Sequence, residues 1–168
     1  MRNEGAFLKL FDEHHRPLFR FAYRLTGSLT EAEDIVQECF LALLRQSSNY
    51  DPNRGSLRTY LFGAVRNQSL KRLRRRESDS IPEPPDRRTP ELSAIEDETS
   101  RAVASAIAAL PESQREILLL AHYEQLSLAE IAEITQLEVT AIKSRLQRAR
   151  ATLRETLAAY TPRTEKML

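Results

Sequence analysis

Apolar residues recur every three or four positions through most of this chain, which is the spacing of one face of an α-helix. The pattern is clearest from Glu138 to about Leu157, where the apolar positions are Val139, Ile142, Leu146, Ala149 and Leu153. The chain of 168 residues also contains only 4 glycines and no tryptophan. We therefore expect an all-α fold.

The first half of the chain predicts three main helices. The first spans about residues 4–25, and Pro17 should kink or split it, because proline removes a backbone donor and crowds the preceding turn. The second begins at a capping box, with Thr30 followed three residues later by Glu33, and ends near residue 45. The third spans about residues 56–75, after a loop rich in turn residues.

The second half predicts about four more helices. One spans roughly residues 91–109, and Pro111 opens the next, since proline suits the first helical turn. Ser127 and Glu130 form another capping box that starts the short helix "LAEIAEIT". The tight turn "QLE" separates this helix from the last one, so the pair has the form of a helix-turn-helix.

A change in composition divides the two halves. The stretch "RRRESDSIPEPPDRRTPELS" is rich in proline and charge and has almost no apolar residues, so it cannot bury enough surface to order itself. We therefore predict two small helical domains, residues 1–76 and 91–168, joined by a flexible linker over residues 77–90.

Charge changes the picture of the last helix. The whole chain is nearly neutral, with 25 Lys and Arg against 24 Asp and Glu, yet no acid occurs between Lys143 and Arg154. Small and hydrogen-bonding side chains lie opposite the apolar stripe of this helix, and cations flank them. Such a surface fits a DNA major groove, where serine and arginine meet base edges and flanking cations meet phosphates. The alternative is a solvated charged helix, although such helices usually mix both signs.

Two other surfaces are candidates for binding. Aromatic residues alternate with arginines in "NYDPNRGSLRTYLFGAVRN", which suits single-stranded nucleic acid, although aromatics at helical spacing also form cores. The second helix exposes Leu41 among Asp34, Gln37 and Glu38, which fits a docking surface for another protein. A single exposed leucine is also ordinary in a soluble protein, so both readings remain open.

Taken together, these segments resemble the bacterial RNA polymerase sigma factors of the extracytoplasmic-function (ECF) type. "AEDIVQECFLALLR" resembles the helix that docks on the β′ coiled coil of the polymerase, and "SLRTYLFGAVRN" with "LKRLRRR" resembles the segment that melts and reads the −10 promoter element. "LPESQREILLLAHYEQLSLAEIAEITQLEVTAIKSRLQRARATL" resembles the helix-turn-helix that reads the −35 element. The resemblance covers nearly all of the chain except the linker and the last few residues.

The resemblance implies a role for each of the three surfaces. Core polymerase, through its β′ coiled coil and β subunit, and promoter DNA are the expected partners. The expected polymerase-binding residues are Asp34, Gln37, Glu38 and Leu41. The expected −10 residues are Asn49, Tyr50, Arg54, Arg58, Tyr60, Arg66, Asn67 and Arg72. The expected −35 residues are Thr140, Lys143, Ser144, Arg145, Gln147 and Arg148.

The chain departs from the family pattern at the turn of the helix-turn-helix. Gln136 replaces the usual turn glycine, so a left-handed backbone there is strained for a residue with a side chain. Glu138, which precedes the last helix, is a poor N-cap.

The remaining chemistry-bearing residues do not predict an enzyme. The glycines are scattered, so no phosphate-binding loop is present, and the histidines and Cys39 lack metal-ligand spacing. We expect no cofactor and no metal. One cysteine and no apolar run near the ~20 residues that span a bilayer predict a cytoplasmic protein without membrane insertion.

Two rival functions remain, and a helical enzyme comes after them. The first is a dimeric helix-turn-helix regulator that acts without polymerase, and the second is a sigma-like adaptor that binds only proteins. The linker and the two separate basic surfaces argue against the first, and the all-basic face of the last helix argues against the second. Many ECF factors are held by an anti-sigma factor, and the sequence leaves open whether this one is.

Overall fold

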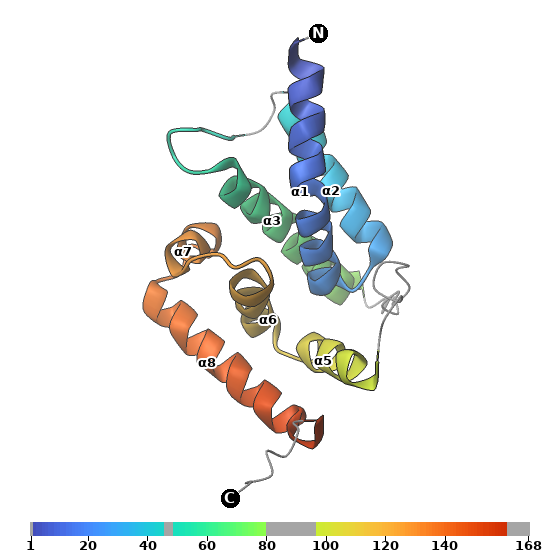
Figure 1. Ribbon diagram of the computed structural model, residues 1–168, viewed down its shortest axis with the longest axis vertical. Helices are drawn as coiled ribbons and strands as arrows, with labels where there is room; N and C mark the ends of the chain where they lie inside the picture. The colour runs from blue at the N-terminus through green and yellow to red at the C-terminus, as the bar shows by residue number, and fades with distance from the viewer. Residues whose placement is uncertain (1, 46–48, 80–96, 161–168) are drawn as a thin grey trace, which may run out of the picture.

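The structure, a computed structural model, describes residues 2–45, 49–79 and 97–160 of the chain (Figure 1). Within these ranges every regular element is a helix, which confirms the predicted all-α class. The N-terminal unit consists of α1 (Arg2–Thr26), α2 (Leu29–Leu44) and α3 (Leu57–Asp79). The C-terminal unit consists of α5 (Glu98–Ala108), α6 (Glu112–Leu118), the π-helix η1 (Leu119–Tyr123), α7 (Leu128–Thr135), α8 (Val139–Thr156) and the short 3₁₀ helix η2 (Ala158–Tyr160).

The N-terminal unit is a bundle in which all three helices contribute to one core. Leu18, Phe21 and Leu25 of α1 pack between Ile35 of α2 and Phe62 of α3, and all five are almost completely buried. The rings of Phe21 and Phe62 meet edge to face with 5.5 Å between their centroids. Such a pair adds about 0.5–1.5 kcal/mol to the free energy gained by burying its apolar surface. This core fixes the positions of the exposed faces of α2 and α3.

The predicted split of the first helix at Pro17 does not occur, and the kink given as its alternative stays a prediction. α1 runs continuously through Pro17 from residue 2 to residue 26. Proline inside a helix costs about 3 kcal/mol, because one backbone hydrogen bond is lost and the ring crowds the previous turn. Residues on both sides of it, from Phe11 to Phe21, pack into the same core, and their burial outweighs this local cost.

The second helix begins at a different cap from the one predicted. Gly27 has a φ of 71° and ends α1, so the next helix can begin at once. Ser28 is the N-cap, and its hydroxyl accepts the Glu31 backbone N–H at 3.3 Å. Thr30 lies inside α2 and exposed, so the predicted Thr30–Glu33 capping box does not form. The glycine turn decided the boundary, which the spacing of threonine and glutamate could not show.

The cap predicted in the second half is confirmed. The Ser127 hydroxyl accepts the Glu130 N–H at 3.1 Å, and the Glu130 carboxylate accepts the Ser127 N–H at 2.7 Å. The preceding helix differs from the prediction, because the segment opened by Pro111 is α6 followed by a turn of π-helix. Gln125, just beyond that turn, has a φ of 53°. Through η1 and Glu124, the segment before α7 contacts α1 and α3 of the N-terminal unit.

The two units pack against each other. α3 packs beside α7 (Figure 1), and α1 contacts both α6 and η1. α3 extends to Asp79, beyond its predicted end and into the expected linker. Residues 80–96, which include the rest of that linker and the predicted start of the fourth helix, lie outside the described residues. The division into residues 1–76, 77–90 and 91–168 therefore stays a prediction.

Candidate nucleic-acid and protein interfaces

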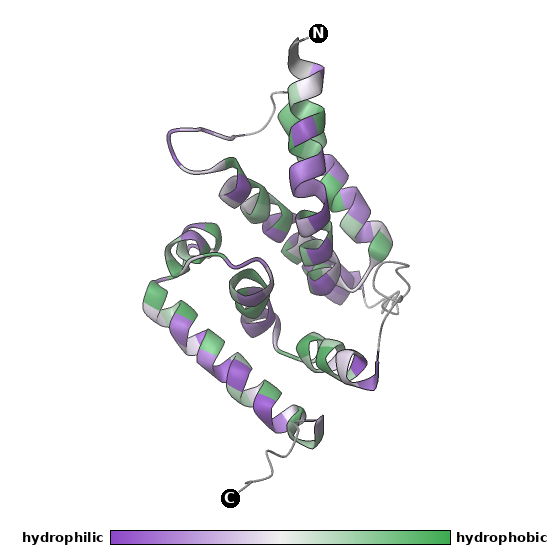
Figure 2. Cartoon of the chain, in the orientation of Figure 1, coloured by the Kyte–Doolittle hydropathy of each residue, from purple (hydrophilic) through white to green (hydrophobic). Residues whose placement is uncertain are grey.

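The last long helix, α8, is amphipathic in the way its sequence predicts. Ile142, Leu146 and Ala149 are buried against the C-terminal unit. Figure 2 shows hydrophilic residues recurring along the same helix. Four expected −35 residues are exposed, and the other two are half-buried. The exposed four are Thr140, Lys143, Gln147 and Arg148; the half-buried two are Ser144 and Arg145.

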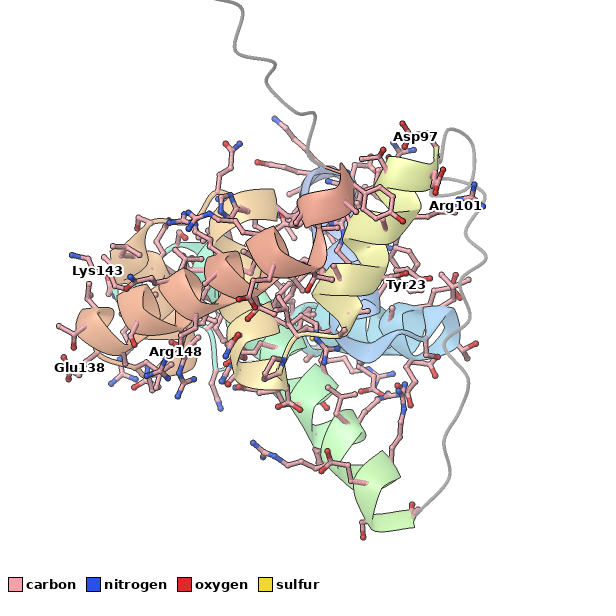
Figure 3. The ribbon with its side chains drawn as sticks, turned by 90° about the horizontal axis from the view of Figure 1, so that it is seen from below. Tyr23, Asp97, Arg101, Glu138, Lys143 and Arg148 are labelled. Atoms are coloured by element: carbon pink, nitrogen blue, oxygen red, sulfur yellow. The ribbon has the colours of Figure 1, made fainter. Side chains whose placement is uncertain are left out.

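The helix-turn-helix geometry comes from α7, a short turn and α8. Gln136 has φ 58° and ψ 31°, the left-handed conformation expected at that position. Its side-chain amide donates to the Glu133 carbonyl at 2.6 Å, which occupies one of the unpaired carbonyls at the end of α7. Glu138 makes no side-chain cap, as expected, so the first amides of α8 have no protein cap there. Glu138 lies at one end of α8, and Lys143 and Arg148 lie along it (Figure 3).

Most of the expected −10 residues surround one groove. The groove has a volume of about 650 Å³ and lies between α2, the loop before α3, α3 and α7. The rings of Tyr50 and Tyr60 stand 5.3 Å apart at its wall. The expected residues that line it are Asn49, Tyr50, Arg54, Tyr60, Arg66 and Asn67.

Arg66 is paired with the C-terminal unit. Its Nε and Nη2 donate to the two carboxylate oxygens of Glu116 on α6, at 2.7 and 3.1 Å. Glu116 is only 3% exposed, and the exposure of the Arg66 side chain is 17%. A two-pronged pair of this kind is directional and strong, and a charge as buried as Glu116 requires such a partner.

Arg58 is also occupied by the C-terminal unit. Its Nη2 donates to the Glu124 carbonyl at 2.6 Å, and its guanidinium lies 5.5 Å from the centre of the Phe62 ring. The Glu124 side chain is buried beside Arg20, Arg24 and Arg58, and desolvation raises its pKa although these arginines oppose the rise. The second expected −10 arginine thus also has a protein partner.

Two further arginines join the units away from the groove. The guanidinium of Arg24 lies 4.0 Å from the centre of the Tyr123 ring, and burial lowers the pKa of Arg24. Arg115 of α6 donates to the Leu25 carbonyl near the end of α1 at 3.2 Å, and desolvation lowers the pKa of Arg115 as well. These contacts tie α1 to the C-terminal unit.

The expected docking residues share the exposed face of α2. The side chains of Asp34 and Glu38 are 54% and 55% exposed, and Leu41 is 36% exposed. Arg72 of α3, an expected −10 residue, reaches both acids, with 3.7 Å from Nη1 to Asp34 Oδ2 and 3.1 Å from Nη2 to Glu38 Oε1. The structure therefore brings the four docking residues together and adds an arginine to their edge.

Sequence reasoning missed the residues that hold these arginines, chiefly Glu116 and Glu124. One indication was present, because Glu116 directly precedes the apolar run "ILLLA" and Glu124 follows soon after it. An acid at such a position is buried only with a partner. Which arginine would supply that partner depends on contacts 50 or more residues apart, and spacing along the chain does not contain them.

Comparison with known proteins identifies the family. Residues 10–78 match Sigma-70 region 2, and residues 100–153 match Sigma-70, region 4. The ECF sigma factor SigL of Mycobacterium tuberculosis is 33% identical, over 92% of this chain and 90% of its own length. The ECF sigma factor RpoE of Cereibacter sphaeroides is 32% identical, over 92% and 87%. The chain belongs to the ECF sigma factors of the sigma-70 family. It is therefore a polymerase-binding factor for promoter recognition and transcription initiation.

Solved sigma factors share the arrangement of this one. The sigma factor RpoE from Bartonella quintana, in a crystal structure with the anti-sigma factor NepR, matches with a TM-score of 0.75 and 27% identity. That match covers 91% of this sigma factor and 97% of the other chain, so it includes both helical units.

Two absences characterise the part of the chain that the structure describes. No helix in residues 2–45, 49–79 or 97–160 combines the length and the apolarity that a bilayer span requires. The same residues contain no group of three or more histidine, cysteine or acidic side chains arranged to hold a metal ion.

Proposed function

We propose that this sigma factor divides its work among three surfaces. The α2 face docks core polymerase, the loop before α3 and α3 itself read the −10 element, and α8 reads the −35 element. The residues assigned to docking are Asp34, Gln37, Glu38 and Leu41. Those assigned to the −10 element are Asn49, Tyr50, Arg54, Arg58, Tyr60, Arg66, Asn67 and Arg72. Those assigned to the −35 element are Thr140, Lys143, Ser144, Arg145, Gln147 and Arg148.

The observation that carries the proposal is the exposed face of α8. It follows a helix-turn-helix turn, carries no acid from Lys143 to Arg154, and keeps small residues near its start, where a groove is approached most closely. Arg148 points away from the buried stripe, whereas Arg154 lies at the far end of the helix. We therefore assign base reading to Arg148 and phosphate contact to Arg154.

The test compares Arg148→Ala with Arg154→Ala in the holoenzyme, on promoter DNA and on DNA with a scrambled −35 element. An arginine paired with guanine contributes about 1–3 kcal/mol of discrimination. A phosphate contact instead changes the slope of log affinity against log salt by about 0.9. Arg148→Ala should reduce the preference for the promoter, and Arg154→Ala should weaken both DNAs alike and flatten the slope. If each variant loses the same affinity for both DNAs, α8 binds DNA only through its charge and does not read the −35 element.

Docking on α2 has a separate test. Asp34→Arg reverses a charge on the exposed face, and Gln37→Ala removes a polar contact from its centre. Both should weaken binding to core polymerase while leaving −35 duplex binding by the full chain unchanged, because α8 lies in the other unit. Wild-type affinity for core polymerase in both variants would refute this assignment.

An anti-sigma factor is a further proposed partner. Its support is the likeness of both units, taken together, to the sigma factor solved with NepR. We also propose that the factor acts in the cytoplasm, where the polymerase is, and that it carries out no covalent chemistry of its own.

A further inference from the structure

Two of the four arginines assigned to the −10 element, Arg58 and Arg66, donate hydrogen bonds to the C-terminal unit. Arg66 and Arg58 are held by α6 and by the residue after η1, and both of these acceptors belong to the C-terminal unit. A guanidinium that gives two N–H groups to a carboxylate cannot give the same two to a phosphate. In this arrangement, therefore, the C-terminal unit takes the place of DNA at Arg66.

The loop before α3 is covered from the same side. A Cβ atom placed on Gly55 would lie 2.7 Å from Glu133 Oε1 of α7. Glu133, Ile134 and Gln136 of α7 and its turn also form one wall of the groove. A nucleotide strand along the loop would therefore meet α7.

α8 is arranged differently. Its buried stripe packs on α6 and α7 within its own unit, and Lys143, Gln147 and Arg148 remain exposed. The arrangement thus covers one DNA-reading surface and leaves the other open.

We propose that the C-terminal unit is an intramolecular cover of the −10 surface, with the Glu116–Arg66 pair as its latch. The free chain must separate its units before it can read the −10 element, whereas the −35 helix is available throughout. This inference rests on the proposed −10 role of Arg58 and Arg66. The cover requires no second protein, because its donors and acceptors all belong to this chain.

The first experiment fixes the cover in place. Gly55→Cys with Glu133→Cys puts two thiols where the loop meets α7, and a short bis-methanethiosulfonate reagent joins them until a reductant removes it. Gly55 lacks the positive φ that would resist a side chain, and Glu133→Cys removes the carboxylate that would collide. The native Cys39 is buried, and burial raises its pKa to about 11, so it does not compete for the reagent.

The joined full chain should bind a single-stranded −10 oligonucleotide at least about tenfold more weakly than the same protein after reduction. The reason is that the cross-link lowers the fraction of molecules whose −10 surface is uncovered. Its affinity for a −35 duplex should stay within about twofold, since α8 is exposed in the covered form. Equal −10 affinity before and after reduction would overturn the proposal.

The second experiment releases the latch. In the same double-cysteine protein, Glu116→Gln removes the charge that Arg66 requires. This variant should cross-link more slowly and bind the −10 oligonucleotide up to about tenfold more tightly. The size of the gain depends on the fraction of the double-cysteine protein that is already uncovered. The matched control is Glu155→Gln, which removes an equal charge from an exposed position of α8 and should change neither. Unchanged cross-linking and −10 affinity in Glu116→Gln would refute the latch.

A third arm separates this inference from the function on which it rests. Arg66→Ala in the holoenzyme, where polymerase holds the units, should impair opening of promoter DNA measured by permanganate reactivity. If opening is normal, the −10 assignment of Arg66 fails, and the cover fails with it. If opening is impaired but the joined chain binds the −10 strand normally, the −10 assignment stands and the cover alone is refuted.

Discussion

Residue 136 offers a sharp test of the helix-turn-helix turn, through the pair of variants Gln136→Gly and Gln136→Ala. Gln136 adopts φ 58° and ψ 31°. This left-handed backbone destabilises a residue with a Cβ by about 1–2 kcal/mol and leaves glycine unstrained. Glycine in turn loses about 0.5–1 kcal/mol through the entropy of the unfolded chain. Both variants lose the 2.6 Å bond from the Gln136 amide to Glu133, so this loss cancels in their comparison.

Gln136→Gly should therefore be more stable than Gln136→Ala, by about 0.5–1 kcal/mol. In a chain of this size that difference raises the midpoint of thermal unfolding by about 1–4 °C. The measurement is urea denaturation followed by circular dichroism at 222 nm, a wavelength that reports helix content.

The control is Ala151→Gly, at an exposed position inside α8, where glycine should cost about 1 kcal/mol. The order of glycine and alanine is thus expected to reverse between the two positions. If glycine is the less stable residue at both, residue 136 is not left-handed and the turn joining α7 to α8 has another geometry.

Three more predictions follow from single features. Burial raises the pKa of Cys39 to about 11, so at pH 8 this thiol should react with iodoacetamide roughly 200-fold more slowly than a free thiol. The free energy of unfolding should also fall as the pH rises from 9 toward 11, because in that range the thiol loses its proton only in the unfolded chain. Ser127→Ala should cost about 1 kcal/mol in urea denaturation, and Ser127→Asn, which keeps a capping oxygen, should cost much less. Phe62→Ala should cost about 3–5 kcal/mol, since the ring is 1% exposed against Phe21, whereas Tyr160→Ala, 42% exposed, should change the free energy of unfolding by less than about 0.5 kcal/mol.

Features set by neighbouring residues could be predicted from the sequence. The buried stripe of α8, the Ser127–Glu130 capping box and the shared face of Asp34 and Glu38 all follow from helical spacing. Each depends on residues within a few positions of one another, and such preferences act before any tertiary contact exists.

Features that depend on competition between local alternatives, or on how distant segments pack, could not be predicted from the sequence. At the start of α2, Ser28 and Thr30 were both acceptable caps, and the left-handed Gly27 decided between them. Pro17 lies inside α1 because burial of the residues on both sides of it outweighs the lost backbone hydrogen bond. The partners of Arg58 and Arg66 depend on how two units pack, which no local pattern encodes.

The distance along the chain between Arg66 and Glu116 has a consequence for the protein as it is made. The contacts among α1, α2 and α3 require no residue from the C-terminal unit, so these helices can pack together as soon as they leave the ribosome. Glu116 is translated 50 residues after Arg66, which at roughly 5–20 residues per second is a delay of about 2.5–10 s. Throughout that interval the arginines of the nascent chain have no acidic partner from α6. A newly made N-terminal unit therefore passes through a stage in which its basic surface is open to nucleic acid, and only the finished chain can close it.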